Sequence, residues 1–471
     1  MSLIKFKKVN KSYGSRSVLK NISFTIEPGQ KIALVGYNGV GKSTLLKIIA
    51  GIEDIDSGLI DIKKETKIGY LPQDLSFLTK QTVEGYLFEN EKKPNDKLRL
   101  KILIFLTGFG FETEILSFQL DKLSTGQKTK IQLIKILLTE PDLILLDEPT
   151  NNLDIPSLIW LENFLQEVNL TCIVVSHDRK FLDKVVGGVM ELDWAQSEIL
   201  LESGSYTNYL KRRQDEFNKQ KEDYENQQEK IDNPIARKGL NMDIDRKGNE
   251  KKFWIKLSEV IVGHPQTFKL NPLSLDISLG ERVAILGLNG SGKTSLLKTI
   301  TGELKPLAGE RSIGSKVFFG NLTQEYTNLP KEKTVIEFMK LNSDLNQSEI
   351  FSLLVKFGLN EKNITGKIIS LSPGERARVL FALFTVKSIN CLVLDEPTNN
   401  LDMETMEALE EMLKDYSGSL LIVSHDRYFL EKIKLDKILI IKEKNIETIY
   451  NLNDHIKTLE KKALKMIRAL K

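Results

Sequence analysis

The chain has 471 residues, a charged fraction of 28%, a hydrophobic fraction of 41% and a formal net charge of +3. These values are typical of a globular protein with two or three domains, and they exclude a chain that binds nucleic acid through its overall charge. The apolar runs fall far short of the ~18 to 20 residues that cross a membrane, and the first residues do not resemble a secretory leader. We therefore expect a cytoplasmic protein.

The first informative stretch is GYNGVGKST, residues 36–44, which lies between an apolar strand-like run and a helical pattern. It fits G-x-x-x-x-G-K-[ST], in which backbone N–H groups and a lysine surround phosphate oxygens and a hydroxyl ligates Mg²⁺. The sequence thus predicts a nucleotide site. Its residues are Gly36, Asn38, Gly39, Gly41, Lys42, Ser43 and Thr44. Tyr13, 29 positions before the lysine, is a candidate to stack on adenine.

Further along the first half, LILLDE predicts a strand with Asp147 and Glu148 at its polar end. An aspartate there can hold Mg²⁺, and a glutamate can orient or deprotonate the water that attacks the γ-phosphate. His177 follows the next strand-like run and is a candidate to touch the γ-phosphate, although a lone histidine there is more often structural. LSTGQ has no general base for its own site. Ser124, Gly126 and Gln127 instead open a helix, where hydroxyl and N–H donors suit a phosphate presented from outside.

The segment from 205 to 251 predicts a linker that is helical in its first half. Leu210, Phe217, Tyr224 and Ile231 are spaced by seven, and Asn233-Pro234 ends the pattern. Residues 237–256 then contain seven Lys or Arg against three Asp or Glu. This part is either a solvated spacer or a basic probe that contacts nucleic acid.

The second half repeats the first, since equivalent motifs lie 251 positions apart up to Gln73 and Gln324 and 248 apart afterwards. Between this glutamine and the LSTGQ stretch, or LSPGE in the second half, neither half therefore carries a sizeable insertion that the other lacks. The second set of site residues is Gly287, Asn289, Gly290, Gly292, Lys293, Thr294, Ser295, Ser372, Gly374, Glu375, Asp395, Glu396 and His425. The position equivalent to Tyr13 holds His264, whose smaller ring is less suited to stack on adenine. We expect cassette domains at 1–204 and 252–453, and a basic amphipathic helix at 454–471.

This set of Walker A, Q-loop, signature, Walker B, D-loop and His-switch motifs, present twice, resembles the ATP-binding cassette superfamily. DEPTNNLD and SHDR-x-FL in both halves resemble the ABC-F family of twin-cassette, ribosome-associated ATPases more closely. The resemblance implies an α/β fold with two tandem P-loop cassettes that close head to tail on two ATPs. Site one would combine Lys42, Ser43, Gln73, Asp147, Glu148 and His177 with Ser372 and Gly374. Site two would combine Lys293, Thr294, Gln324, Asp395, Glu396 and His425 with Ser124 and Gly126. The Mg²⁺ ligands would be Ser43, Gln73 and Asp147, and Thr294, Gln324 and Asp395.

The resemblance also implies a ribosomal partner, with contacts to rRNA and tRNA, and a monomer whose two cassettes pair within the chain. Whether the role is in ordinary translation or in antibiotic protection stays open. An alternative from another class is a tandem ATPase subunit of a transporter with separate membrane partners. Cys172 and Cys391 lie in apolar runs and are predicted core residues, so we expect no zinc site and no iron–sulfur cluster.

Overall fold

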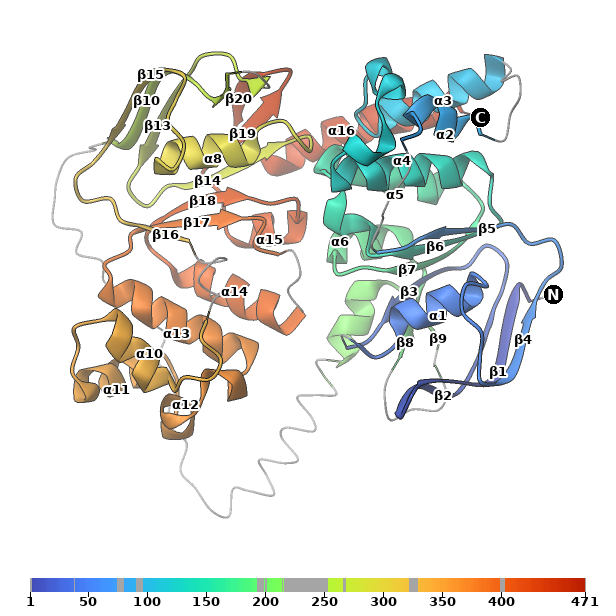
Figure 1. Ribbon diagram of the computed structural model, residues 1–471, viewed down its shortest axis with the longest axis horizontal. Coiled ribbons are helices and arrows are strands. Elements are labelled where there is room, and N and C mark those ends of the chain that lie inside the picture. The colour runs from blue at the N-terminus through green and yellow to red at the C-terminus, as the bar shows by residue number, and fades with distance from the viewer. Residues whose placement is uncertain are drawn as a thin grey trace. The chain divides into compact units, whose positions relative to one another are not determined.

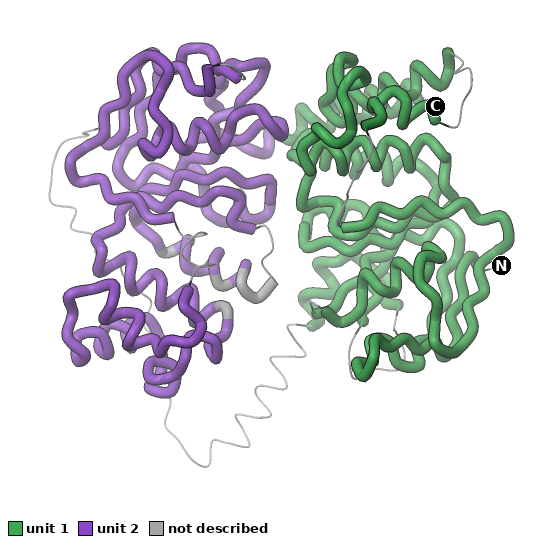
Figure 2. Tube along the Cα trace, viewed as in Figure 1, with its two compact units in different colours: residues 1–235, 455–471 green, residues 236–454 purple. Residues whose placement is uncertain are grey.

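The computed structural model describes residues 2–37, 39–73, 80–89, 96–192, 199, 201–213, 215, 253–265, 268–321, 329–398 and 403–470 (Figure 1). Asn38, Gln324 and the linker from 216 to 252 therefore lie outside the described residues. The chain divides into two compact units, residues 1–235 with 455–471 and residues 236–454 (Figure 2). Of the predicted linker helix, residues 206–213 are described and are helical.

The first unit is built around a six-stranded sheet of order β5-β6-β7-β3-β8-β9, parallel except for β9. Its strands are β3 (Lys31–Val35), β5 (Ile68–Leu71), β6 (Leu143–Asp147), β7 (Thr171–Val175), β8 (Gly188–Glu191) and β9 (Leu201–Ser203). Every residue of β6 and β7 is buried, as their unbroken apolar runs predict for strands covered on both faces. Cys172 lies in β7 and is among these buried residues.

A second, antiparallel sheet of order β2-β1-β4 packs with α1 against the parallel sheet in one hydrophobic core. It consists of β1 (Ile4–Tyr13), β2 (Arg16–Ile26) and β4 (Ser57–Ile62). The helices of this unit are α1 (Lys42–Ile49), α2 (Val83–Leu87), α3 (Asp96–Gly108), α4 (Thr125–Leu138), α5 (Ile155–Glu167) and α6 (Arg179–Val185), with short 3-10 turns at Thr113–Ser117, Leu120–Lys122 and Pro149–Asn152.

The second unit repeats this plan with the strand orders β16-β17-β18-β14-β19-β20 and β13-β10-β15. Its strands are β10 (Phe253–Ile261), β11 (Gly263–His264), β12 (Phe268–Lys269), β13 (Leu273–Ser278), β14 (Arg282–Gly287), β15 (Ala308–Ile313), β16 (Phe319–Asn321), β17 (Cys391–Asp395), β18 (Ser419–Val423), β19 (Lys437–Lys442) and β20 (Asn445–Ile449). Its helices are α8 (Lys293–Thr301), α10 (Val335–Asn342), α11 (Gln347–Lys356), α12 (Glu361–Thr365), α13 (Pro373–Val386), α14 (Met403–Asp415) and α15 (Arg427–Lys432), with a 3-10 turn at Ile368–Ser370. The predicted α/β fold with two tandem cassettes is thereby confirmed.

The last helix, α16 (Leu452–Arg468), lies in the first unit from residue 455 onward. Ala463 and Ile467 are buried, and Glu460 Oε1 accepts a hydrogen bond of 2.5 Å from Lys184 Nζ on α6. The same Lys184 amino group is 3.4 Å from a carboxylate oxygen of Glu162, which is fully buried. The carboxyl end of the chain is thus part of the first unit's structure. No helix within the described ranges is long and apolar enough to span a bilayer.

Candidate nucleotide sites

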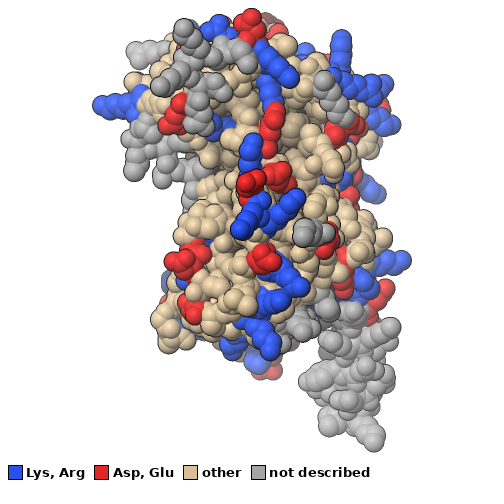
Figure 3. Space-filling view, turned by 90° about the vertical axis from the view of Figure 1, so that its right-hand side faces the viewer, with Lys and Arg blue, Asp and Glu red and all other residues tan. Residues whose placement is uncertain are grey.

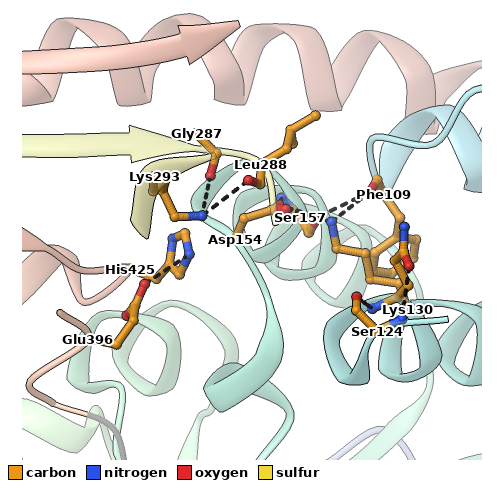
Figure 4. Close-up of polar contacts among 11 residues, drawn as sticks. Phe109, Ser124, Lys130, Asp154, Ser157, Gly287, Leu288, Lys293, Glu396 and His425 are labelled. Atoms are coloured by element: carbon orange, nitrogen blue, oxygen red, sulfur yellow. Dashed lines mark hydrogen bonds and ion pairs between the residues drawn. The ribbon is translucent and has the colours of Figure 1, made fainter. Parts of the chain in front are cut away.

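In the second unit the predicted phosphate loop joins β14 to α8, as the strand–loop–helix pattern requires. Gly292 precedes the first turn of α8 with φ of 98°, a conformation that favours glycine. A Cβ at this position would come within 2.3 Å of the ring of Phe268. The Lys293 amino group donates to the carbonyl oxygens of Gly287 and Leu288, each at 3.1 Å (Figure 4). The loop therefore curls around the lysine nitrogen, where a phosphate oxygen would compete for the same donor.

This loop borders a cavity of about 410 Å³. The residues that line it are His264, Phe268, Asn289, Gly290, Gly292, Lys293, Thr294, Ser295, Asp395, Glu396 and Val423. Thr294 Oγ1 lies 3.5 Å from Asp395 Oδ1. A hydroxyl and a carboxylate facing one cavity are the oxygen donors that Mg²⁺ takes, so these two side chains fit a magnesium ion.

Glu396 follows β17 directly and stands beside His425. Its backbone has φ of 48°, in the left-handed region that a non-glycine residue rarely adopts, and its N–H donates to Val423 O at 2.8 Å. His425 Nε2 is 3.3 Å from Glu396 Oε1 (Figure 4). Burial raises the pKa of the Glu396 carboxyl to about 7, while nearby Lys293 opposes the rise. A carboxylate with this pKa can accept a proton near neutral pH.

The first unit repeats this geometry. Lys42 Nζ donates to Gly36 O at 2.8 Å and to Tyr37 O at 3.2 Å. Glu148 has φ of 51°, and its Oε1 is 3.3 Å from His177 Nε2. Burial raises the pKa of Glu148 to about 7, with a smaller contribution from the neighbouring Asp147 carboxylate.

One carboxylate oxygen of Glu148 is positioned to accept a hydrogen bond from a bound water or substrate. Glu148 Oε2 is buried and has no hydrogen-bond partner among the described residues. A buried carboxylate oxygen without a donor is costly, and an attacking water held beside the nucleotide would satisfy it. The residues present therefore fit a site that is completed by substrate.

The two units differ where the adenine would stack. Tyr13 is 48% exposed, and its hydroxyl hydrogen-bonds to Glu53, which raises the tyrosine pKa. In the second unit His264 lines the cavity together with Phe268, which the sequence analysis did not identify. Phe268 is found only once tertiary structure brings β12 against the loop, because it lies 25 residues before Lys293 without a recognisable motif.

The signature serines begin helices, as predicted. Ser124 caps α4 and Ser372 caps α13, each in a capping box whose second member is Gln127 or Glu375. In these boxes the serine oxygen accepts a backbone N–H, so the hydroxyl proton stays available to an external acceptor. Gly126 and Gly374 lie in the first turns behind them. Each signature is thus a helix start that presents donors outward.

A buried ion pair near the first signature was not predicted. Lys130 on α4 and Asp154, which caps α5, are 2.6 Å apart and almost completely buried (Figure 4). The Lys130 amino group also donates to Phe109 O at 3.0 Å, and Ser157 Oγ donates to Asp154 Oδ1 at 2.5 Å. The pair thus ties the helix that starts at Ser124 to the segment that follows Glu148.

Within each unit the structure brings together the phosphate loop, the acidic residues at the strand end and the histidine that the sequence predicted. Ser43 and Thr44 lie in the first turn of α1, and Gln73 lies two residues beyond β5. The pairing of each phosphate loop with the signature of the other unit remains a prediction.

Comparison with known proteins adds family relationships. A family model described as "ABC transporter" matches residues 19–151 and 270–399. The chain is 34% identical to the putative ATP-binding protein YdiF of Bacillus subtilis, over 98% of this chain and 83% of that protein. It is 30% identical to ABC transporter F family member 5 of Arabidopsis thaliana, over 91% and 74%. It is also 30% identical to the energy-dependent translational throttle protein EttA of Haemophilus influenzae, over 89% and 88%. The fold is similar to that of an RNase-L inhibitor structure, with a TM-score of 0.63 and 20% identity over 97% of this chain and 93% of that one.

Proposed function

The chain belongs to the ABC-F family of the ATP-binding cassette superfamily, and we propose from this premise that it is an ATPase that acts on the ribosome. The observation that carries the ATPase assignment is the glutamate–histidine contact of 3.3 Å, present in both units beside a phosphate loop. The ribosomal assignment is supported by the relative whose name is energy-dependent translational throttle protein.

In the proposed reaction, Lys42 and Lys293 bind the β- and γ-phosphates of ATP, together with the N–H groups of their loops. Glu148 and Glu396 take the proton from the water that attacks the γ-phosphorus, while the bond from that phosphorus to the ADP oxygen breaks. His177 and His425 hold these carboxylates in position. Asp147 in the first unit, and Thr294 and Asp395 in the second, would hold Mg²⁺, which would supply positive charge against the phosphates. Little covalent chemistry is needed, so positioning and charge account for most of the rate.

We infer further that the sites are composite. Each signature offers donors at a helix start but has no acid or base of its own, so it suits a γ-phosphate that another cassette presents. Ser372 and Gly374 would complete the site of Lys42, and Ser124 and Gly126 would complete that of Lys293. Because one chain carries both cassettes, a monomer can form both sites.

The decisive test replaces both glutamates, Glu148→Gln and Glu396→Gln, which removes the base and keeps its shape. ATP binding should persist, while turnover should fall by at least ~10²-fold. The trapped protein should co-sediment with ribosomes in ATP but not without nucleotide. Comparing complexes with and without a bound antibiotic would separate a role in translation from a protective one.

A matched control is Glu65→Gln with Glu443→Gln. These two exposed glutamates also have positive φ values, 64° and 49°, and lie outside the phosphate loops and strand ends. Turnover in this control should match that of the unaltered protein. Turnover that is unchanged in the Glu148 and Glu396 variant would refute the assignment of the base. Normal ATP hydrolysis without ribosome binding would refute the choice of partner alone.

A further inference from the structure

One side of the first unit carries a concentration of lysines that the ATP sites do not use. Ile4, Phe6 and Val9 of β1 point into the core. Because side chains alternate along a strand, Lys5 and Lys7 point to the outer side, and Lys8 joins them at a bulge. Lys63 and Lys64 directly follow the neighbouring strand β4. We call these five lysines the basic sheet face: three lie on β1, and two follow β4 where its end pairs with the start of β1.

The lysines of this face include neighbours on one strand, and one acidic residue, Asp61, lies among them. Lys5 lies opposite Asp61 and Lys7 lies opposite Leu59 in the β1–β4 register. Lys5 and Lys7 are about 7 Å apart along the strand, and neighbouring strands are about 4.8 Å apart. Within the described part of the chain, no ion pair occupies the amino groups of the five lysines. Figure 3 views the side of the first unit that carries β1 and β4, and it shows lysine and arginine side chains over the lower half with acidic side chains between them.

The second unit provides an internal comparison, because β10 and β15 pair there in the same register. Lys256 stands where Lys5 does, and it lies opposite Ser312. The positions 251 residues after Lys7, Lys8, Lys63 and Lys64 are occupied by Ser258, Glu259, Gly314 and Ser315. Lys8 and Glu259 even share the left-handed backbone of the bulge, with φ of 50° and 49°. The sheet and its bulge are thus kept in both units, while four of the five lysines are not.

This difference excludes two ordinary explanations of the lysines. They are not all needed to form the three-stranded sheet, since the second unit forms it with Lys256 as the one equivalent lysine. They are not needed for phosphate binding at the phosphate loop, since Lys42 and Lys293 have the same geometry in the two loops. Like charges held on one rigid sheet repel one another, and an anionic partner would relieve that cost.

We propose that the basic sheet face is a docking surface for the phosphate backbone of folded RNA; this inference rests on the proposed ribosomal function and names the surface that contacts rRNA. The outward side chains of residues 5–8 and 59–64 include no aromatic ring that could stack on a base. Contact through lysine amino groups alone suits phosphates and is independent of base sequence. Leu59, 67% exposed, is the one large apolar side chain among those residues, which is too little to insert into a lipid surface.

The test changes Lys7, Lys8, Lys63 and Lys64 to Gln in the full-length chain that carries Glu148→Gln and Glu396→Gln. The control changes Lys305, Lys316, Lys331 and Lys442 to Gln, which removes the same charge from exposed positions of the second unit. Ribosome co-sedimentation with ATP is measured over a salt series, and binding of a labelled RNA duplex and of anionic phospholipid vesicles is measured in parallel. ATP turnover in versions that keep both glutamates reports on folding and should be unchanged.

We expect the sheet variant to bind ribosomes at least ~10-fold more weakly, with a salt slope smaller by up to about 3.6, because each of four lost phosphate contacts lowers the slope by about 0.9. The control should bind as the parent does. Equal binding by both variants, equal losses in both variants, or binding to vesicles instead of RNA would each overturn the inference. If the parent fails to bind ribosomes, the proposed function fails. Binding of the RNA duplex then tests the basic sheet face separately. Loss of duplex binding in the sheet variant, but not in the control, would support the inference. Absence of duplex binding by the parent would overturn the inference.

Discussion

The buried pair of Lys130 and Asp154 gives a quantitative prediction about stability. Replacing Lys130 by Met keeps most of the side-chain volume but leaves the Asp154 carboxylate buried without its cation. The carboxylate is 0% exposed, so water cannot replace the lysine. Breaking such a pair costs about 3–5 kcal/mol, which is a large part of the free energy of unfolding of a domain. We therefore expect Lys130→Met to destabilise the first unit by that amount.

The double variant Lys130→Met with Asp154→Asn separates charge from helix capping. Asparagine is as good a cap as aspartate, so it can keep the bond to Ser157 N–H while it removes the buried negative charge. We expect the double variant to be less destabilised than Lys130→Met alone, by about 2 kcal/mol or more. Such non-additivity is the signature of a direct interaction between the two side chains.

Tryptophan fluorescence during urea unfolding can measure these effects. The chain has three tryptophans, and Trp160 packs on Phe109, whose carbonyl accepts from Lys130. Changing Trp194 and Trp254 to Phe leaves Trp160 as the reporter of this region. The matched control is Arg378→Met at the equivalent position of the second unit, read with Trp254 kept instead. Arg378 is only partly buried and donates to Gly358 O at 3.3 Å, so its loss should cost about 1 kcal/mol.

A destabilisation below about 1 kcal/mol for Lys130→Met would refute this reasoning, because a buried charge would then have lost its partner at almost no cost. A double variant as unstable as the sum of the two single variants would also contradict it. In that case the lysine and the aspartate would contribute separately, through packing and capping.

Two further predictions test roles that rest on the sequence alone: the pairing of each phosphate loop with the opposite signature, and the contacts of the linker. Ser372→Arg should abolish nucleotide trapping at the site of Lys42 and spare the site of Lys293, because the arginine would fill the place of the γ-phosphate; loss at Lys293 instead would refute head-to-tail pairing. Changing Arg237, Lys238, Arg246 and Lys247 to Ala should weaken ribosome association at two salt concentrations without altering ATP hydrolysis by the free protein. Equal binding and equal salt slopes would mean that the linker is a spacer.

Much of each nucleotide site could be predicted because local sequence determines its geometry. A glycine loop between a strand and a helix has few conformations, and Asp395 with Glu396 must emerge at the end of their strand. The carboxyl ends of neighbouring parallel strands meet at one sheet edge, which brings Glu396 to His425. The burial of Cys172 and Cys391 followed from the apolar runs around them.

The features that were missed depend on contacts between segments far apart in sequence. Nothing around Lys130 distinguishes it from an exposed lysine of an amphipathic helix, and its burial depends on contacts with Phe109 and Asp154, which come from other segments. Phe268 reaches the cavity through the fold of a short strand. The helix at the carboxyl end was expected, but its contact with Lys184 depends on charge pairing across nearly 280 residues, which local periodicity cannot reveal.

The repeat itself supplies a means to separate what ATP chemistry requires from what this protein requires. Where both units keep a residue and its geometry, as with the glutamates that have positive φ and contact a histidine, the shared chemistry explains it. Where the two units keep the backbone conformation but differ in the side chain, ATP chemistry does not explain the difference. The bulge with Lys8 in one unit and Glu259 in the other is such a place. Asymmetry of this kind is what the docking surface proposed above predicts, because identical surroundings would favour the same charge on both sheets. A partner that is itself asymmetric, such as a large RNA-containing particle, would impose that difference.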